Sequence, residues 1–191
     1  MFRLEYLAPT EAWRPGPDTI RSFAGGYRAC RVHGPARLVR LLSHAGQAPE
    51  GQMYGANRED GEFWFAEADF RRIRAEAEAD LRTQGGYDLA RAKERLSMYL
   101  RHQFRDLLAV RRDWTPSFDY YALLAVPAGA SVVALVGKVR EQPVYSKDFP
   151  GEELARKAGL KLSGGLTQYV INFTFPANQP LRQRIQSPIG F

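Results

Sequence analysis

The sequence is poor in the residues that build covalent or metal-based sites. Cys30 is the only cysteine among 191 residues, so neither a disulfide framework nor a zinc site made of cysteines can form within this chain. The histidines, His33, His44 and His102, recur at no ligand spacing, and there is no phosphate-binding loop and no Gly-x-Ser-x-Gly elbow. We therefore expect ordinary packing to hold the fold, and no metal in the site.

Long apolar runs and blocks of like charge are also missing. No run of roughly 18 apolar residues occurs, and Glu5, Pro9 and Glu11 interrupt the first part of the chain, so we expect neither a signal peptide nor a membrane span. The net charge is +6, but the basic residues are mostly arginines scattered along the chain. Scattered charge is typical of a solvated surface, and a nucleic-acid partner is the alternative.

The chain is rich enough in apolar residues to build one core. Hydrophobic residues make up 45% of the 191 positions, which favours a single domain over 1–191. Residues 1–26 contain three prolines and a Gly-Gly pair, and we expect an irregular lead-in there with at most one edge strand.

Two stretches have the periodicity of amphipathic helices. One begins at Ala66, and the second, over about 88–110, resembles an insertion. Shorter helices are predicted at Leu38–Leu42 and Glu152–Ala158, and the loop over 46–61 is long enough to be a lid. The polar face of the second long helix is rich in arginine, with Arg91, Arg95, Arg101 and Arg105.

Several runs read as β-strands. The run Tyr27–His33 places Arg31 on one face and Arg28 on the other, and the late run over 163–173 begins with a glycine turn and carries Gln168 near its start. The alternative without a functional role is a bend followed by a core strand whose Gln168 side chain reaches solvent. The other predicted strands are Glu62–Phe65, Tyr120–Val126 and Ser131–Val136.

Four of these segments occur in a telling order. Tyr-Arg-Ala-Cys-Arg-Val-His-Gly comes first, then a glycine-containing loop into Phe-Trp-Phe and a helix, then Leu-Ala-Val-Pro-Ala-Gly and a strand, and last Gly-Gly-Leu-Thr-Gln-Tyr-Val-Ile. Over 27–173 this order resembles the ADP-ribosyltransferase-like toxin domains of bacterial polymorphic toxins. The resemblance implies an α+β fold with a split antiparallel sheet core and flanking helices.

The resemblance also implies roles for individual residues. Arg31 would grip NAD, within the pattern that continues through Val32, His33 and Gly34; Arg28 is its rival. Trp64 and Phe65 would shape the nicotinamide pocket, and Gly165 and Gln168 would approach the nicotinamide ribose. Chemically these types suit the task, because a guanidinium binds a pyrophosphate, an aromatic ring stacks on nicotinamide, and an amide bonds ribose hydroxyls. We expect Arg31, Trp64 and Gln168 to line one cleft.

The implied activity is cleavage of the bond between nicotinamide and ribose, with transfer of ADP-ribose to a protein or nucleic acid. No carboxylate stands beside Gln168, so hydrolysis of NAD and transfer to a strong nucleophile both stay open. An immunity or antitoxin protein is an implied partner, and the implied place of action is the bacterial cytoplasm or the cytoplasm of a target cell. The alternative from a different class is a basic nucleic-acid-binding module without enzymatic activity.

Overall fold

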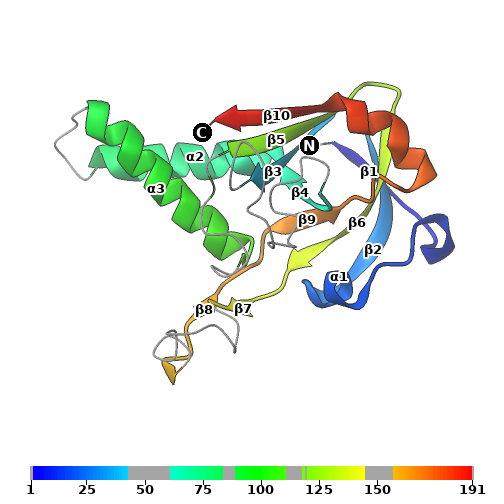
Figure 1. The fold of residues 1–191 in the computed structure, drawn as a ribbon, viewed down its shortest axis with the longest axis horizontal. Helices are drawn as coiled ribbons and strands as arrows, with labels where there is room; N and C mark the ends of the chain where they lie inside the picture. The colour runs from blue at the N-terminus through cyan, green and yellow to red at the C-terminus, as the bar shows by residue number, and fades with distance from the viewer. Residues whose placement is uncertain are drawn as a thin grey trace, which may run out of the picture.

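The computed structural model describes residues 2–42, 61–83, 89–110, 118, 120–144 and 157–190, with the backbone alone for 89–93 and 188. Eight strands form one sheet, in the order β1-β2-β6-β9-β4-β3-β5-β10, and every pairing is antiparallel (Figure 1). The strands are β1 (Arg3–Tyr6), β2 (Phe23–His33), β3 (Ala36–Leu42), β4 (Phe63–Ala66), β5 (Tyr120–Val126), β6 (Ser131–Val139), β9 (Thr167–Val170) and β10 (Ile185–Gly190). A separate pair joins β7 (Gln142–Pro143) to β8 (Lys161–Leu162).

The mixed α and β class and the antiparallel sheet predicted from the sequence are confirmed. The predicted split of the sheet is not found among the described strands. The reason is β9, which bonds β6 along one edge and β4 along the other and so joins the two halves into one sheet.

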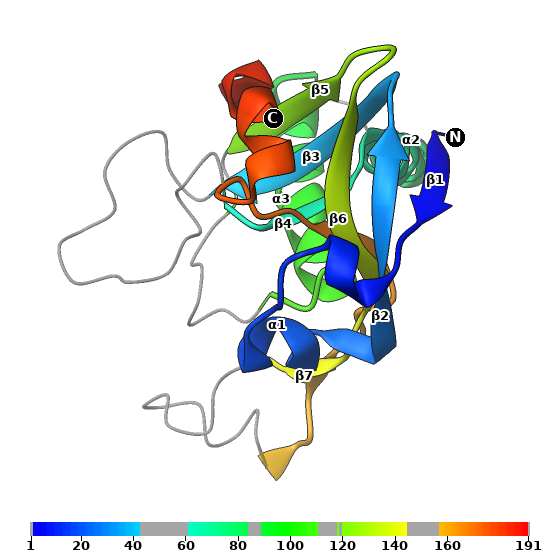
Figure 2. The same cartoon turned by 90° about the vertical axis from the view of Figure 1, so that its right-hand side faces the viewer.

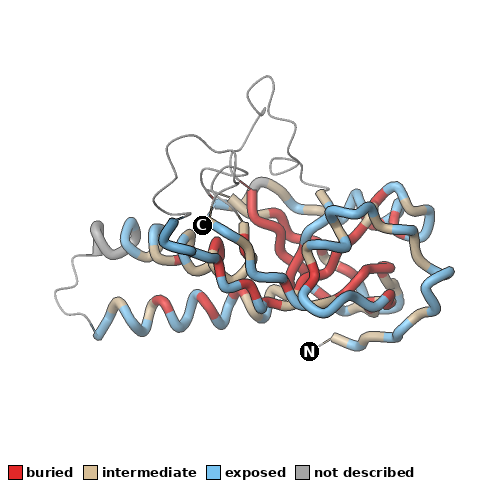
Figure 3. The backbone as a smooth tube through the Cα atoms, turned by 90° about the horizontal axis from the view of Figure 1, so that it is seen from below, coloured by how far each residue is buried: buried red, intermediate tan, exposed pale blue. Residues whose placement is uncertain are grey.

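The sheet is strongly curved around one of its faces, which we call the inner face. A single core cluster on that face runs from Leu4 of β1 to Ile185 of β10, the two strands at opposite ends of the strand order. The strand direction turns strongly between β2 and β6 at one end of the sheet and β3 and β5 at the other (Figure 1). Figure 3 shows the buried backbone gathered in this curl.

Helices and the lead-in cover the opposite, outer face. Helices α2 (Glu67–Thr83) and α3 (Leu89–Leu107) pack on the half made by β3, β4 and β5, where the rings of Phe70 and Phe104 stack with centroids 5.2 Å apart. Over β2, β6 and β9 the cover is Leu7, Ala12 and Trp13 of the lead-in, which also forms η1 (Pro9–Glu11) and α1 (Pro17–Arg21) (Figure 2). Both long helices were predicted.

The short helix predicted at Leu38–Leu42 is wrong, since these residues belong to β3. Leu38 packs into the inner cluster and Val39 into the cluster beneath the helices, so the strand is apolar on both faces. Burial on both faces removes the period-two alternation by which a half-exposed strand is recognised. The loop over 46–60 and the helix predicted at Glu152–Ala158 lie outside the described residues, apart from the end of the latter.

The C-terminal segment, which the sequence left unassigned, forms η3 (Pro176–Arg184) and the edge strand β10. Asn178 fastens it to β6 and is 0% exposed. Its Oδ1 accepts a hydrogen bond from Val133 N at 2.8 Å, and its Nδ2 donates to Val133 O at 2.9 Å and to Asn172 O at 3.0 Å. No helix of the described residues is both long and apolar enough to cross a membrane.

Candidate functional site

The two motifs predicted to hold the nicotinamide end of NAD lie on neighbouring strands. On β4 and β9, Phe65 is directly opposite Gln168, and Trp64 is opposite Tyr169. The pairing continues past the strand ends, because Ile171 N donates to Glu62 O at 2.8 Å. Segments about one hundred residues apart in the sequence are therefore in register.

The two aromatic residues point to opposite faces of the sheet. Trp64 belongs to the inner cluster and is 1% exposed, and its Nε1 donates to Gly61 O at 2.7 Å. Phe65 belongs to the cluster under α2 and α3, on the outer face. Because side chains alternate along a strand, Gln168 shares the outer face with Phe65 and not the inner face with Trp64.

Gln168 is held from the lead-in. Its side chain is 5% exposed, and Nε2 donates to Ser22 Oγ at 2.9 Å and to Ser22 O at 3.4 Å. The glycine turn before it has positive φ at Gly164 (66°) and Gly165 (87°), and Gly165 N donates to Val139 O at 2.9 Å. Gly165 thus sets where β9 begins, as only glycine adopts such angles readily.

Arg31 lies apart from this pair. On the intervening strand β6, Arg31 is opposite Val133 and Gln168 is opposite Gly137, positions about 13 Å apart along an extended strand. Arg31 Nη1 instead contacts Glu5 Oε1 at 3.5 Å. Arg31, Trp64 and Gln168 therefore do not line one cleft in the described part of the chain.

The three residues that follow Arg31 take part in packing or hydrogen bonding within the fold. His33 Nε2 lies 2.7 Å from Glu5 Oε2, and this hydrogen bond, together with the charge of Arg31, holds the pKa of the Glu5 carboxyl below its ordinary value. Val32 is buried in the inner cluster. Gly34 leaves no room for a side chain, because a Cβ there would lie 1.9 Å from Pro127 O.

A different arginine lies beside the aromatic strand. Arg40 is on β3, one position beyond the pair Val39–Phe65, and is 7% exposed. Its Nη1 donates to Phe63 O at 3.2 Å. Sequence reasoning missed Arg40 because it assigned this segment to a helix; the neighbouring β-branched and leucine residues were the available signal.

An open hollow of about 320 Å³, the tyrosine–arginine pocket, lies near the start of β9. Its lining residue Arg28 belongs to the inner face, because Arg28 pairs with Val136 and Val136 pairs with Tyr169, the partner of Trp64. The rival of Arg31 is thus the one that shares a face with Trp64. The lining residues are Tyr6, Gly25, Gly26, Tyr27, Arg28, Val136, Gly137, Lys138 and Thr167.

Among the described residues, the pocket carries positive charge without a counter-ion. No carboxylate lines it, and within the described residues neither Arg28 nor Lys138 takes part in an ion pair. The guanidinium carbon of Arg28 lies 3.4 Å from the centre of the Tyr6 ring. Tyr6 is 50% exposed and Tyr27 is 36% exposed, so aromatic surface stands beside the cations.

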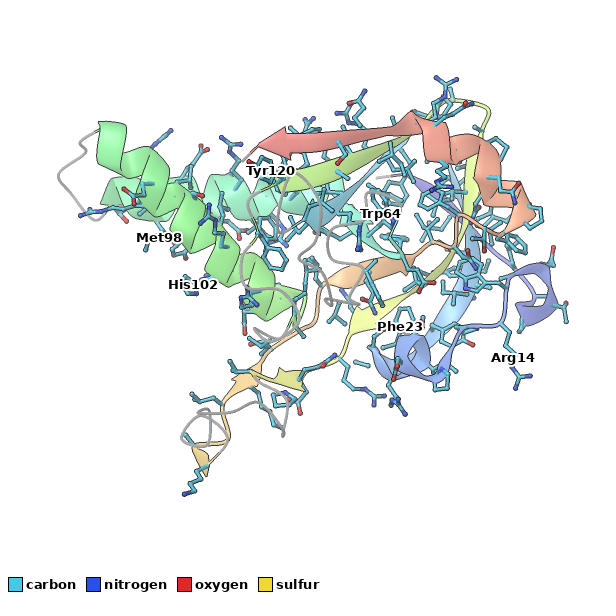
Figure 4. All side chains as sticks on the ribbon, viewed as in Figure 1. Arg14, Phe23, Trp64, Met98, His102 and Tyr120 are labelled. Carbon is cyan, nitrogen blue, oxygen red and sulfur yellow. The ribbon has the colours of Figure 1, made fainter. Side chains whose placement is uncertain are left out.

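The arginine face predicted for α3 is not continuous among the described side chains. Arg95 is exposed, but Arg105 is 7% exposed and its Nη1 donates to Val110 O at 3.0 Å. The Nε of Arg101 is also shielded from solvent. Met98 and His102 are the outward side chains labelled on this helix in Figure 4.

Comparison with known proteins adds no relative. No family model, curated protein or solved structure matches the chain. The function must therefore be argued from the residues themselves.

Proposed function

We propose that this protein is an NAD-consuming enzyme of the ADP-ribosyltransferase-like kind, which cleaves the bond between nicotinamide and ribose. The observation that carries the proposal is the pairing of Phe65 with Gln168 across β4 and β9. The sequence resemblance assigns these two strands to the nicotinamide pocket, and they come together although the sequence separates them widely.

To cleave the bond between nicotinamide and ribose, the protein must mainly orient NAD and stabilise the charge that develops. Departure of nicotinamide passes through an oxocarbenium-like state, and hydrogen bonds to the ribose hydroxyls that strengthen in that state lower the barrier. The two hydrogen bonds from Gln168 Nε2 to Ser22 engage the donors of the amide, so the acceptor oxygen is the atom proposed to bond a ribose hydroxyl. Because Gln168 is 5% exposed, the proposal requires that NAD displace neighbouring side chains to reach it.

The acceptor of ADP-ribose in the proposal is a protein or a nucleic acid, with water as the alternative acceptor. A neutral amide is a poor base, so an acceptor must bring its own nucleophilicity. An immunity or antitoxin protein, and action within the cytoplasm of the producing or a target bacterium, belong to the same proposal.

The test is the release of nicotinamide from NAD by the purified protein, with cell lysate as the source of acceptors. Gln168→Ala should lower the rate a hundredfold or more, since loss of an oriented contact in a transition state costs about 3 kcal/mol. Gln179→Ala is the matched control, because Gln179 is an exposed amide whose Nε2 donates to Thr174 O. Label counted separately in protein, in nucleic acid and in free ADP-ribose distinguishes transferase from hydrolase.

Two arginine variants complete the test. Arg31→Ala should abolish turnover if the resemblance assigns the cofactor arginine correctly, whereas Arg28→Ala should do so if the tyrosine–arginine pocket holds the pyrophosphate. NAD that neither binds nor disappears in the presence of lysate contradicts the proposal.

A further inference from the structure

We propose that the tyrosine–arginine pocket is a nucleotide site, in which a phosphate group lies between Arg28 and Lys138 and the base stacks on tyrosine. Of the residues weighed for NAD, only Arg28, the rival of Arg31, lines this pocket. The inference goes beyond the proposed cleavage of NAD, because a nucleotide can bind here whether or not the protein cleaves NAD.

Arg28 and Lys138 both line the pocket, and both are exposed. Arg28 pairs with Val136, and Lys138 lies two residues further along the same strand, so both side chains leave the same face. The bulge of β2 lies between the pairs Ala24–Lys138 and Arg28–Val136, so the two residues border the same irregular stretch of the sheet. Both side chains are cationic, and a phosphate oxygen within reach of both would be stabilised by both.

Tyr6 supplies the aromatic part of the site. The guanidinium of Arg28 lies over its ring, which holds the planar fork of donors in one orientation. Half of Tyr6 and about a third of Tyr27 are exposed. A nucleobase stacks on exposed aromatic rings of this kind regardless of its sequence identity.

A glycine bulge keeps the mouth of the pocket open. Ala24 pairs with Lys138 and Arg28 pairs with Val136. Between these two pairs, β2 has three residues, Gly25, Gly26 and Tyr27, whereas β6 has only Gly137. Gly25 and Gly26 have φ values of 73° and 95°, and a Cβ on either would meet nothing within 4 Å. Such bulges often re-aim a strand beside a binding site, and here the open space lets a ligand approach the backbone.

The lining of the pocket indicates the ligand class. Two cations beside exposed tyrosine rings favour a ligand that joins an anionic group to a flat ring, and an open pocket of about 320 Å³ leaves room for one nucleotide unit. That unit has three sources: a free mononucleotide, the ADP half of NAD, or the terminal nucleotide of a nucleic acid. All three present a phosphate beside a base.

The experiment measures binding to the full chain by calorimetry, with AMP, ADP, adenosine and inorganic phosphate as probes. We expect saturable binding of AMP and ADP, and at least about tenfold weaker binding of adenosine and of phosphate, because each lacks one half of the contacts. Arg28→Gln and Lys138→Gln should each weaken AMP binding by about tenfold or more. Arg184→Gln, an exposed arginine of η3, is the control and should leave the affinity unchanged.

Three results would overturn the inference. They are no saturable binding of AMP or ADP, equal binding of adenosine and AMP, or wild-type affinity in both Arg28→Gln and Lys138→Gln. Both substituted side chains are exposed, so thermal unfolding should confirm that the variants fold.

Further arms separate the sources of the nucleotide. NAD bound with the same dependence on Arg28 and Lys138 assigns the pocket to the cofactor, whereas preference for a short single strand with a 5′-phosphate over the same strand without it assigns the pocket to the acceptor. If the short nucleic-acid strand binds but AMP and ADP do not, the result contradicts the proposed site. AMP binding requires no turnover, so failure of the nucleotide site and failure of NAD cleavage are seen separately.

Discussion

Gln168 and Ser22 lie 146 residues apart in the sequence and are joined by a hydrogen bond of 2.9 Å between Nε2 and Oγ. The carbonyl of Ser22 also accepts a hydrogen bond from Arg140 N at 2.8 Å. The lead-in is therefore fastened at one residue to both β9 and the end of β6. Residues near the start of the chain set the environment of the predicted catalytic amide.

The bond between Gln168 and Ser22 should be measurable as a coupling energy. Ser22→Ala and Gln168→Ala should each lower the free energy of unfolding by about 1 kcal/mol, and the double variant should lose clearly less than their sum. Urea denaturation of the four proteins measures this cycle. Strict additivity would show that the two side chains do not act together.

Asn178→Ala should be among the more damaging polar substitutions. It leaves the buried N–H and C=O of Val133 without their side-chain partners, so we expect a loss of about 3 kcal/mol in the free energy of unfolding. Asn178→Asp keeps the size but replaces the donor with a carboxylate oxygen facing Val133 O and Asn172 O, and should be at least as harmful. If Asn178→Asp left the free energy of unfolding unchanged, that result would contradict the hydrogen-bond assignment.

Gly137→Ala should destabilise the protein and disturb the tyrosine–arginine pocket. The added Cβ would lie 2.6 Å from the ring of Phe23 and 2.7 Å from Gly26 O, and overpacking of this kind costs about 1–3 kcal/mol. Gly16→Ala is the control, because a Cβ there meets nothing within 4 Å. Thermal unfolding should separate the two, and Phe23→Leu should partly rescue Gly137→Ala if the ring is the obstacle.

Stability should fall in alkaline solution. Burial raises the pKa of Tyr169 from 10.0 to about 12 and that of Cys30 from 9.0 to about 12. Both groups are neutral when protonated, so their burial contributes fully to the free energy of unfolding while the pH is below their pKa values in the unfolded chain. This contribution is lost as the pH rises through 9 and 10 toward 12. Unfolding measured from pH 8 to 11 should show this decline, and Tyr169→Phe should reduce it; a flat profile in the wild type would contradict the burial of these groups.

Much of the secondary structure was predictable because local signals were strong. The strands β4, β5, β6 and β9 are rich in β-branched, leucine or aromatic residues, and a Gly or Pro lies close to each of them in the sequence. The turn between β5 and β6 also suggests a hairpin, but these two strands are not neighbours in the sheet. The helices α2 and α3 show clear apolar stripes. At β3 the local signal failed, because a strand buried on both faces has no alternation to detect.

The arrangement of the site was not predictable in the same way. The motif that continues through Val32, His33 and Gly34 favoured Arg31 over Arg28 as the cofactor arginine. The face that an arginine shares with Trp64, however, depends on the register of β2, β6, β9 and β4 together. The tyrosine–arginine pocket likewise combines β1, a bulge in β2 and the start of β9. A β-bulge shifts the register of the residues beyond it. The sequence of one strand alone does not indicate which residues of the neighbouring strand they will face.

The sequence by itself determined the fold class, most of the strands and long helices, the scarcity of thiol and histidine ligands, and the excess of positive charge. These follow from composition and from periodicity over a few turns or strand residues. Only the tertiary structure decided which residues share a face: it put Phe65 opposite Gln168, left Arg31 with Glu5, and gathered Arg28, Lys138 and Tyr6 around one pocket. The physical reason is that strand pairing and sheet curvature minimise exposed apolar surface over the whole chain, and that balance is not contained in any one segment.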